Sequence, residues 1–295
     1  MLSLQETQPT KKPPWLKVKF PSDPNFFYVS NTLKKENLHT ICRSAKCPNI
    51  SECWSRRTAT FLILGEVCTR ECAFCAIKKG APSSPSPEEP AQVAEAVSLL
   101  GLRYAVVTSV TRDDLPDGGA SLFAETIRAV RERTPGIRVE VLVPDFNGSE
   151  KALETVVRAR PDILNHNLET TEAIYPQINR PGENYRRSLK VLEKAGEMGA
   201  VTKSGLMVGL GESEEEILQC FSDLRRVSCD LLTIGQYLQP SKAHAPVRKY
   251  YSPREFDELK RAAFNSGFRD VESGPLVRSS YKAHKMFESL QERTA

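Results

Sequence analysis

Three cysteines within eight residues constrain this chain more than any other feature. Cys68, Cys72 and Cys75 form a C-x3-C-x2-C group directly after an apolar run. Three thiolates at this spacing can bind one face of an iron–sulfur cube and leave its fourth iron without a protein ligand. A structural zinc site would need a fourth cysteine or histidine nearby, and the nearest histidines are His39 and His166. A disulfide framework is less consistent still, so the group predicts a cluster with an open iron.

A second cysteine triplet precedes the first. Cys42, Cys47 and Cys53 form a C-x4-C-x5-C group, again without a fourth ligand close by. Two triplets that each lack one ligand predict two clusters. We expect both clusters to face the same open end, or mouth, of the barrel that the strand and helix pattern predicts. Cysteines that hold metal as thiolates indicate a reducing compartment. The remaining Cys220 and Cys229 are expected to be small buried hydrophobes, and we assign them no role.

Composition narrows the class of protein. A chain of 295 residues can bury one sizeable core. Its net charge of +4 is spread without long runs of one sign, which argues against a nucleic-acid partner. We find neither an apolar run of about 18 residues, as a membrane span needs, nor a secretory signal in Met1 to Lys19. The sequence therefore predicts a cytoplasmic protein.

From Thr58 onward, apolar β-type runs alternate with amphipathic helical stretches. The expected strands are Thr60–Gly65, Tyr104–Ser109, Arg138–Val143, Asp162–Asn165, Thr202–Val208 and Leu231–Gln236. The expected helices are Pro90–Leu100, Ala120–Arg133, Glu150–Arg160, Asn184–Met198, Ser213–Val227 and Pro253–Ser266. Six such repeats predict an α/β fold, a partial (β/α)6 TIM barrel, with its active site at the carboxyl ends of the strands.

We expect three parts in the chain. Residues 1–57 are an N-terminal extension with the second triplet, 58–268 the partial barrel, and 269–295 a C-terminal extension. Within the first part, the polar arm Met1–Pro24 is expected to lie across the main body. A short helix is expected over Asn31–Thr40.

Polar residues that follow the strands are candidates for ligand contacts. Gly118 and Gly119 could let backbone approach the polar end groups of a ligand, and Asp113, Asp114 and Asp117 could accept hydrogen bonds. An ordinary helix N-terminus explains that segment about as well. Glu169 could accept hydrogen bonds from two ribose hydroxyls. His166 is expected to be a structural histidine.

The C-x3-C-x2-C group, with Phe74 before its last cysteine, resembles the signature of the radical S-adenosylmethionine enzymes. Further segments extend this resemblance, from about Cys42 to Ala283, to the lipoyl synthase family. They are the two triplets with Cys47-Pro48-Asn49 and Glu52-Cys53-Trp54, then Val110–Ala120, Asn165–Thr170, Gly235–Ser241 and Arg278-Ser279-Ser280-Tyr281. Arg43-Ser44 and Thr111 depart from the family pattern but leave the ligands intact.

The resemblance implies two 4Fe–4S clusters and S-adenosylmethionine as cofactors. Cys68, Cys72 and Cys75 would hold the cluster that generates the radical. Cys42, Cys47 and Cys53 would hold an auxiliary cluster whose fourth ligand is Ser280, with Ser279 as the alternative. The expected contacts to S-adenosylmethionine are Phe74, Thr108, Ser109, Asp113, Gly118, Gly119, Asn165, Asn167, Glu169, Lys203, Gly205, Met207, Gln236 and Tyr237.

The implied reaction inserts two sulfur atoms, at C6 and C8 of a protein-bound octanoyl-lysine, with the auxiliary cluster as sulfur donor. Octanoyl C–H bonds are too strong and too weakly acidic for an ordinary base, so a radical is required. A biotin synthase-like sulfur-inserting enzyme and a two-cluster electron carrier are the alternatives. The second triplet before the radical motif argues against the first. An electron carrier would need four cysteines per cluster and no long barrel, whereas this chain has three cysteines per cluster and a predicted barrel.

The resemblance also implies partners. The substrates would be octanoylated lipoyl carrier domains of 2-oxoacid dehydrogenase E2 subunits and of the glycine cleavage H protein. An electron donor such as flavodoxin or ferredoxin and an iron–sulfur carrier that rebuilds the spent cluster would also be needed. Such carrier domains are typically acidic, and lysines of the arm could help to dock them. These lysines are Lys11, Lys12, Lys17 and Lys19.

Overall fold

A curved, mostly parallel sheet forms the centre of the molecule. The computed structural model describes residues 11–18, 20–36 and 38–292. Seven parallel strands run in the order β2 (Thr60–Ile63), β5 (Tyr104–Ser109), β6 (Arg138–Leu142), β7 (Ile163–Asn165), β8 (Thr202–Val208), β9 (Leu231–Gln236) and β10 (Asp270–Gly274). The first six are the predicted strands, to within two residues at each end. The fold class of a partial α/β barrel is therefore confirmed.

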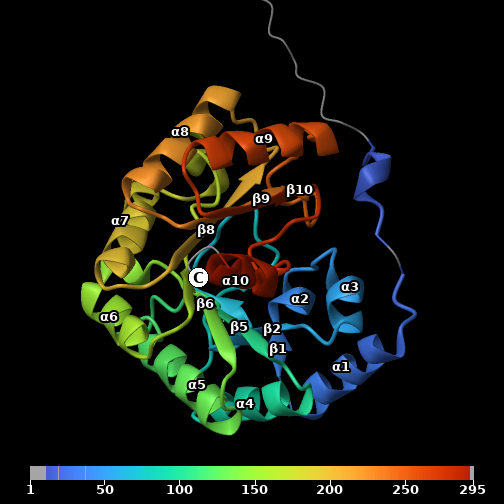
Figure 1. The fold of residues 1–295 in the computed structure, drawn as a ribbon, viewed down its shortest axis with the longest axis vertical. Coiled ribbons are helices and arrows are strands. Elements are labelled where there is room, and N and C mark those ends of the chain that lie inside the picture. The colour runs from blue at the N-terminus through green and yellow to red at the C-terminus, as the bar shows by residue number, and fades with distance from the viewer. Residues whose placement is uncertain (1–10, 19, 37, 293–295) are drawn as a thin grey trace, which may run out of the picture.

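Helices connect successive parallel strands and cover the outside of the sheet. They are α4 (Glu89–Leu99), α5 (Ala120–Arg133), α6 (Glu150–Arg158), α7 (Glu183–Glu197), α8 (Glu214–Arg226) and α9 (Pro253–Asn265). Figure 1 shows them as an arc around the strands. Capping boxes at Ser213 and Ser252 begin α8 and α9, because each serine accepts from a backbone N–H that the first turn leaves unpaired. The six predicted helices are confirmed.

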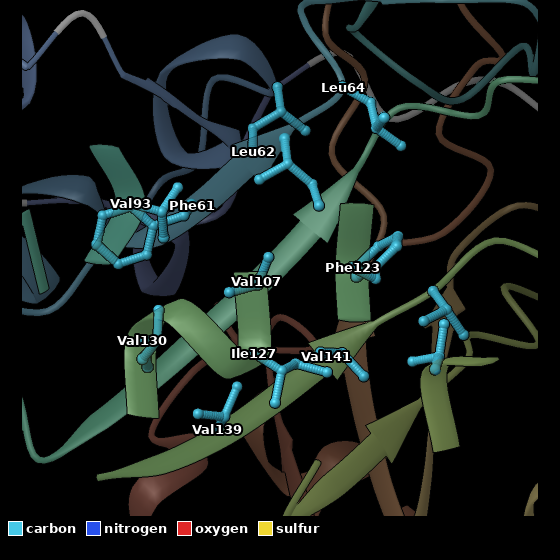
Figure 2. Close-up of a cluster of buried hydrophobic side chains, with 14 of the residues drawn as sticks. Phe61, Leu62, Leu64, Val93, Val107, Phe123, Ile127, Val130, Val139 and Val141 are labelled. Atoms are coloured by element: carbon cyan, nitrogen blue, oxygen red, sulfur yellow. The ribbon is translucent and has the colours of Figure 1, made fainter. Parts of the chain in front are cut away.

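The main core lies between the first strands and helices α4 and α5. Phe61 and Leu62 of β2 are fully buried there, together with Val107 of β5 and with Phe123 and Ile127 of α5 (Figure 2). Each such side chain contributes about 1.5–3 kcal/mol when it is removed from water. This core supports β2, the strand that leads into the cysteine loop.

Two elements differ from the sequence prediction. The expected helix over Asn31–Thr40 is wrong in its bounds. Helix α1 spans Pro24–Lys35, because the side chain of Asp23 caps its N-terminus, and His39–Thr40 instead forms β1, antiparallel to β2. The second difference is β10, which was not predicted. Its residues are largely polar and only partly buried, as suits a strand at the edge of the sheet.

The N-terminal arm lies against the barrel where the structure describes it. Leu16 of the short 3-10 helix η1 (Pro14–Leu16) is buried, and Trp15 Nε1 donates to the carbonyl of Tyr251, 3.1 Å away. This confirms the expected position for residues 11–18. Lys19 and the first ten residues fall outside the described part of the chain.

The C-terminal helix covers the opposite end of the barrel from the cysteine loop. Met286 and Leu290 of α10 (Ala283–Glu292) pack against Ile163 and Leu231, the first residues of β7 and β9. In Figure 1 this helix lies over the middle of the sheet. The chain from β10 to α10 must therefore pass from the carboxyl ends of the strands to their amino ends.

Two further expectations concern organisation and location. The division into residues 1–57, 58–268 and 269–295 stays a prediction, although both outer parts contribute a strand to the sheet. Within the described ranges, we find no helix with the length and apolar character that crossing a membrane requires.

Gly119 tests the packing at the start of α5. Its φ is +88°, and a Cβ there would overlap the side chain of Leu64. Gly136 has nearly the same φ, +84°, but nothing lies within 4 Å of a Cβ. We expect Gly136→Ala to lower the free energy of unfolding by about 1–2 kcal/mol, the cost of a left-handed alanine. We expect Gly119→Ala to lower the free energy of unfolding by about 1–3 kcal/mol more, because the new methyl group overpacks against Leu64. Denaturant unfolding measures both, and equal losses would contradict this packing.

Candidate active site

The loop with Cys68, Cys72 and Cys75 follows β2 and is fixed by three neighbouring loops. Thr69 N donates to the carbonyl of Thr111 after β5, 3.1 Å away. Ala73 N donates to the carbonyl of Ile178, at the end of the 3-10 helix η3 (Glu172–Ile178), 2.9 Å away. On the other side, Ala245 N donates to the carbonyl of Ala73, also at 2.9 Å. The loop is thus tied to the segments after β5, β7 and β9.

Partial burial makes the thiols of Cys72 and Cys75 poor acids on their own. Desolvation, followed by the neighbouring thiols of Cys72 and Cys68, raises the pKa of Cys75 to about 12. Desolvation also raises the pKa of Cys72, against the nearby guanidinium of Arg180. Cationic iron would offset this lost solvation and stabilise the groups as thiolates. The donor set therefore fits an iron–sulfur cluster.

The second triplet has the same electrostatic character. Desolvation first, and then Cys47, raises the pKa of Cys42 to about 11. Desolvation followed by both other thiols raises the pKa of Cys53 to about 12. All six thiols are free cysteines. This triplet also fits a cluster held by three sulfurs.

The segment between β10 and α10 brings the Arg-Ser-Ser-Tyr motif to the second triplet. Asn49 Nδ2 donates to the carbonyl of Leu276, 2.6 Å away, and the hydroxyl of Tyr281 donates to the carboxylate of Glu52 at 3.2 Å. Arg278 is close enough to Cys47 to lower the pKa of that thiol, against its burial. Residues more than 200 positions apart in sequence therefore meet here.

The two serines of the motif point to different neighbours. Ser280 Oγ lies 2.9 Å from Thr60 Oγ1, and the backbone of Thr60 is hydrogen-bonded to the thiol of Cys42. Ser279 Oγ instead donates to Asn167 Oδ1, 2.8 Å away. Only Ser280 is thus connected to the cysteine triplet by a shared neighbour.

The triplets lie beside opposite ends of β2. Cys42 contacts Thr60 at the start of the strand, whereas Cys68 follows its end. Our expectation that both face one barrel mouth is therefore wrong, because the turn from β1 into the next helix places Cys42 at the amino end of β2. From Thr60 to Leu64 the strand direction covers about 13 Å. Among the described residues no three His, Cys, Asp or Glu side chains are placed to hold a single metal ion, so the six thiols do not form one mononuclear site.

Several buried polar atoms without partners lie at or just after the carboxyl ends of β5 and β7. Ser109 Oγ and Asn165 Oδ1 have no hydrogen-bond partner in the described structure. The same is true of His166 Nε2 and Arg180 Nε, which the sequence analysis did not assign to a ligand. An unsatisfied buried polar group costs about 1–3 kcal/mol. A polar ligand such as S-adenosylmethionine would supply the missing partners.

Glu169 and Asn167 lie on the same side of the barrel. Glu169 has a left-handed φ of 72° and bridges to β8, where its N–H donates to the carbonyl of Gly205 at 3.0 Å. Its carboxylate lies 4.0 Å from Arg180 Nη1. A Cβ on Gly205 would come within 2.6 Å of Asn167 Oδ1 and 3.0 Å of Ser279 Oγ. Gly205 is therefore needed because the C-terminal segment approaches β8 closely.

A buried ion pair forms the interior beneath these residues. Lys203 Nζ lies 2.9 Å from Glu140 Oε1, and both side chains are completely buried. The hydroxyl of Tyr104 donates to the other carboxylate oxygen at 2.7 Å, and Asn165 Nδ2 donates to the first at 3.3 Å. Lys203, an expected ligand contact, is thus already satisfied by protein.

Other expected contacts also have structural partners. Thr108 Oγ1 donates to the carbonyl of Leu142, and the hydroxyl of Tyr237 donates to the carbonyl of Ala245. The side chain of Gln236 makes four hydrogen bonds to backbone groups. Gly118 and Gly119 avoid Phe146 and Leu64.

Three more expected contacts lie near the cysteine loop. Asp113 is paired with Arg70. Phe74 and Met207 pack against an apolar cluster that includes Ile178 and Tyr237. For all three, as for the other expected contacts, a ligand role stays a prediction.

Two residues of the site, Arg70 and Arg180, were not predicted. They lie in loops, where an arginine carries no periodic signal. His244 follows the sixth predicted strand, whose loop was expected to line a substrate channel, and its Nε2 lies 3.1 Å from the carbonyl of Cys75.

Comparisons with known proteins extend this picture. The family model of the radical SAM superfamily matches residues 62–224, and that of the N-terminal domain of lipoyl synthase matches residues 1–47. The lipoyl synthase of Rubrobacter xylanophilus is 54% identical, over 95% of this chain and 88% of the relative. That of Chlorobaculum parvum is 53% identical, over 96% and 97%. These names agree with the lipoyl synthase resemblance and not with the biotin synthase-like alternative.

Solved structures with a similar fold share so little sequence with this chain that the comparison supports the fold alone. Methylornithine synthase has a TM-score of 0.54 at 14% identity, over 72% of this chain and 70% of that one. A maturase of the FeFe-hydrogenase has a TM-score of 0.55 at 12% identity, over 78% and 62%.

His166 gives the site a measurable pH dependence. Burial lowers its pKa to about 4, from 6.5 in an unfolded chain, while Nδ1 lies 2.8 Å from the carbonyl of Val143. The unfolded state therefore takes up a proton first, and stability present above about pH 6.5 is lost as the pH falls toward 4. Between pH 6.5 and 5 this amounts to about 2 kcal/mol.

We expect His166→Gln to flatten the fall in unfolding free energy over that range, measured by urea unfolding. Between pH 7 and 8 the unfolding free energies of the wild type and the variant should change with pH in parallel. Equal slopes below pH 6.5 would contradict a buried neutral His166.

Proposed function

Because the chain belongs to the lipoyl synthase family, within the radical S-adenosylmethionine superfamily, we propose how its own residues divide the work. The family reaction inserts two sulfur atoms into a protein-bound octanoyl chain and uses 4Fe–4S clusters and S-adenosylmethionine. In this chain Cys68, Cys72 and Cys75 hold the radical-generating cluster. The observation that supports this best is a loop of three partly buried thiols, which backbone hydrogen bonds to three neighbouring loops fix at the carboxyl edge of a parallel sheet.

Cys42, Cys47 and Cys53 hold the auxiliary cluster, and Ser280 is its fourth protein ligand. The contact of Ser280 with Thr60, beside Cys42, supports this choice over Ser279. When bound, the clusters and S-adenosylmethionine supply the radical and the sulfur. The protein's part is to bind them at opposite ends of β2 and to hold the acyl chain between them.

Polar residues at the carboxyl ends of β5 and β7 bind S-adenosylmethionine. Ser109 and Asn165 offer unsatisfied buried oxygen atoms to it. Glu169 accepts hydrogen bonds from the ribose hydroxyls, while Arg180, at 4.0 Å from that carboxylate, offers its free Nε–H to an anionic group. Asn167 contributes from the loop that contacts Ser279.

The enzyme acts on lipoyl carrier proteins and needs a reductant. We propose E2 subunits of 2-oxoacid dehydrogenases and the glycine cleavage H protein as carriers. Flavodoxin or ferredoxin serves as donor, and an iron–sulfur carrier rebuilds the spent cluster. We also retain the three-part division at residues 57 and 268.

Separate serine variants test the ligand assignment and the function together. Wild-type protein should hold about eight irons per chain and release 5′-deoxyadenosine when reductant, S-adenosylmethionine and an octanoylated carrier are added. We expect Ser280→Ala to keep that cleavage but to lower sulfur insertion by about 10–100-fold, because the auxiliary cluster loses a ligand. Ser279→Ala is the matched control and should retain more insertion.

The opposite order of the two serine variants would reject Ser280 as the ligand. About four irons in the wild type, or eight without carrier-dependent cleavage, would reject the function itself.

The arm lysines are expected to attract acidic carrier domains. Lys11, Lys12 and Lys17 are exposed on an arm that lies against Tyr251. Replacing them and Lys19 by glutamine should weaken carrier binding several-fold at low salt, with a smaller difference at 0.5 M salt, because the attraction is screened there. Calorimetric titration measures both. The control variant, Lys151→Gln with Lys285→Gln, changes exposed lysines elsewhere. Unchanged affinity in the arm variant would remove this role.

A further inference from the structure

We propose that Arg70 is a positioning residue that holds the cysteine loop in its cluster-binding shape before any cluster is present. Its guanidinium is clamped between Asp113, after β5, and Asp145, after β6. This inference rests on the proposed function in one respect, namely that Cys68, Cys72 and Cys75 bind a cluster. The clamp itself consists of contacts within the protein.

Both carboxylates bind the guanidinium through two oxygens. Arg70 Nε and Nη2 lie 2.7 and 2.9 Å from the two oxygens of Asp113. Nη1 and Nη2 lie 3.0 and 2.6 Å from those of Asp145. Nη2 also donates to Asn147 Oδ1, 2.8 Å away. Paired two-point contacts of this kind fix orientation as well as position.

The partners of Arg70 are themselves immobilised. The side chain of Asp145 is completely buried and accepts from Asn147 N at 3.0 Å, at the start of the 3-10 helix η2 (Phe146–Gly148). Asn147 Nδ2 donates to Asp113 Oδ1, 2.9 Å away, which joins the two carboxylate loops. Asp113 also accepts from Thr69. The guanidinium therefore binds a preformed receptor that spans two loops.

Arg70 lies between two of the cysteines that it positions. It follows Cys68 by two residues and precedes Cys72 by two, and its backbone N–H lies 3.4 Å from Cys68 Sγ. Fixing the side chain of Arg70 therefore fixes the backbone on which both sulfurs depend. By contrast, Glu71 in the same loop is exposed and makes no side-chain contact that could do so.

Replacing Arg70 with lysine distinguishes this clamp from a simple effect of positive charge. If Arg70 only neutralised nearby thiolates, any cation at that position would serve. Lysine keeps the charge but cannot make two paired contacts with both carboxylates. Arg187 provides a matched control, because Nη1 of Arg187 lies 3.7 Å from the same Asp145 but reaches it from α7 and does not contact the loop.

The test uses the full chain with both clusters loaded. Iron release to a chelator is followed in wild type, Arg70→Lys, Arg70→Gln and Arg187→Gln, with the auxiliary cluster as internal reference. The two clusters are told apart because S-adenosylmethionine perturbs the electron paramagnetic resonance signal of only the radical-generating one. We expect both Arg70 variants to lose that cluster about tenfold faster, with the auxiliary cluster and Arg187→Gln unchanged.

Hydrogen exchange on the cluster-free full chain tests the preformed shape directly. Peptides covering residues 66–76 should exchange about tenfold faster in Arg70→Gln, the change in opening equilibrium that a loosened loop implies. Peptides of α5 should be unchanged, which shows that the variant still folds.

Three results would overturn the clamp: wild-type iron release in Arg70→Lys, equal acceleration in Arg187→Gln, or unchanged exchange over residues 66–76. A wild-type chain that loads no cluster at Cys68, Cys72 and Cys75 would instead reject the proposed function.

Discussion

The partial removal of the cysteine thiols from water is the constraint around which this structure is arranged. Desolvation and neighbouring thiols raise the pKa of Cys42 to about 11 and of Cys53 and Cys75 to about 12. Because a cluster binds cysteines as thiolates, loading it at these residues must release protons. Each triplet also has one arginine from a distant segment beside it, the half-buried Arg278 near Cys47 and the buried Arg180 near Cys72. These cations favour the thiolate form that the clusters require.

Strand β2 lies between the two cysteine triplets, one proposed for radical generation and one for sulfur donation. Thr60 at one end of the strand contacts Ser280, and the cysteine loop leaves the other end. If the two clusters were adjacent, no acyl chain could lie between them. Cysteine triplets beside opposite ends of one strand would let a radical act on the acyl chain from one end and a sulfur donor from the other. The C-terminal segment completes this arrangement, because it passes Asn167 and β8 before it reaches Thr60.

Strand and helix patterns could be predicted because buried parallel strands and amphipathic helices carry strong periodic signals. β10 escaped prediction because only Val271 and Gly274 among its five residues are buried. The spacing of the two cysteine triplets predicts two clusters, and the assignment of these six cysteines as their ligands stays a prediction.

The partners of individual polar residues could not be predicted, because they depend on which loops meet. Asp113 was expected to contact a ligand but binds Arg70, and Gly119 accommodates Leu64. The sequence favoured Ser280 and left Ser279 as the alternative, whereas the fold gives the two serines different neighbours. The spacing of the triplets likewise could not show that they lie at opposite ends of β2.

The interior of the barrel shows how the fold directs binding energy. Glu140 and Lys203 are fully buried, yet each has a partner, and Tyr104 and Asn165 add hydrogen bonds to the carboxylate. Removing one member of such a pair costs about 3–5 kcal/mol, so this layer is held in one arrangement. Just above it, Ser109, Arg180 and the oxygen of Asn165 stay unsatisfied. Because unpaired buried groups cost about 1–3 kcal/mol each, a ligand gains most where it meets these atoms. A satisfied layer below and unsatisfied atoms above would thus fix both the depth and the orientation of a polar cofactor bound there.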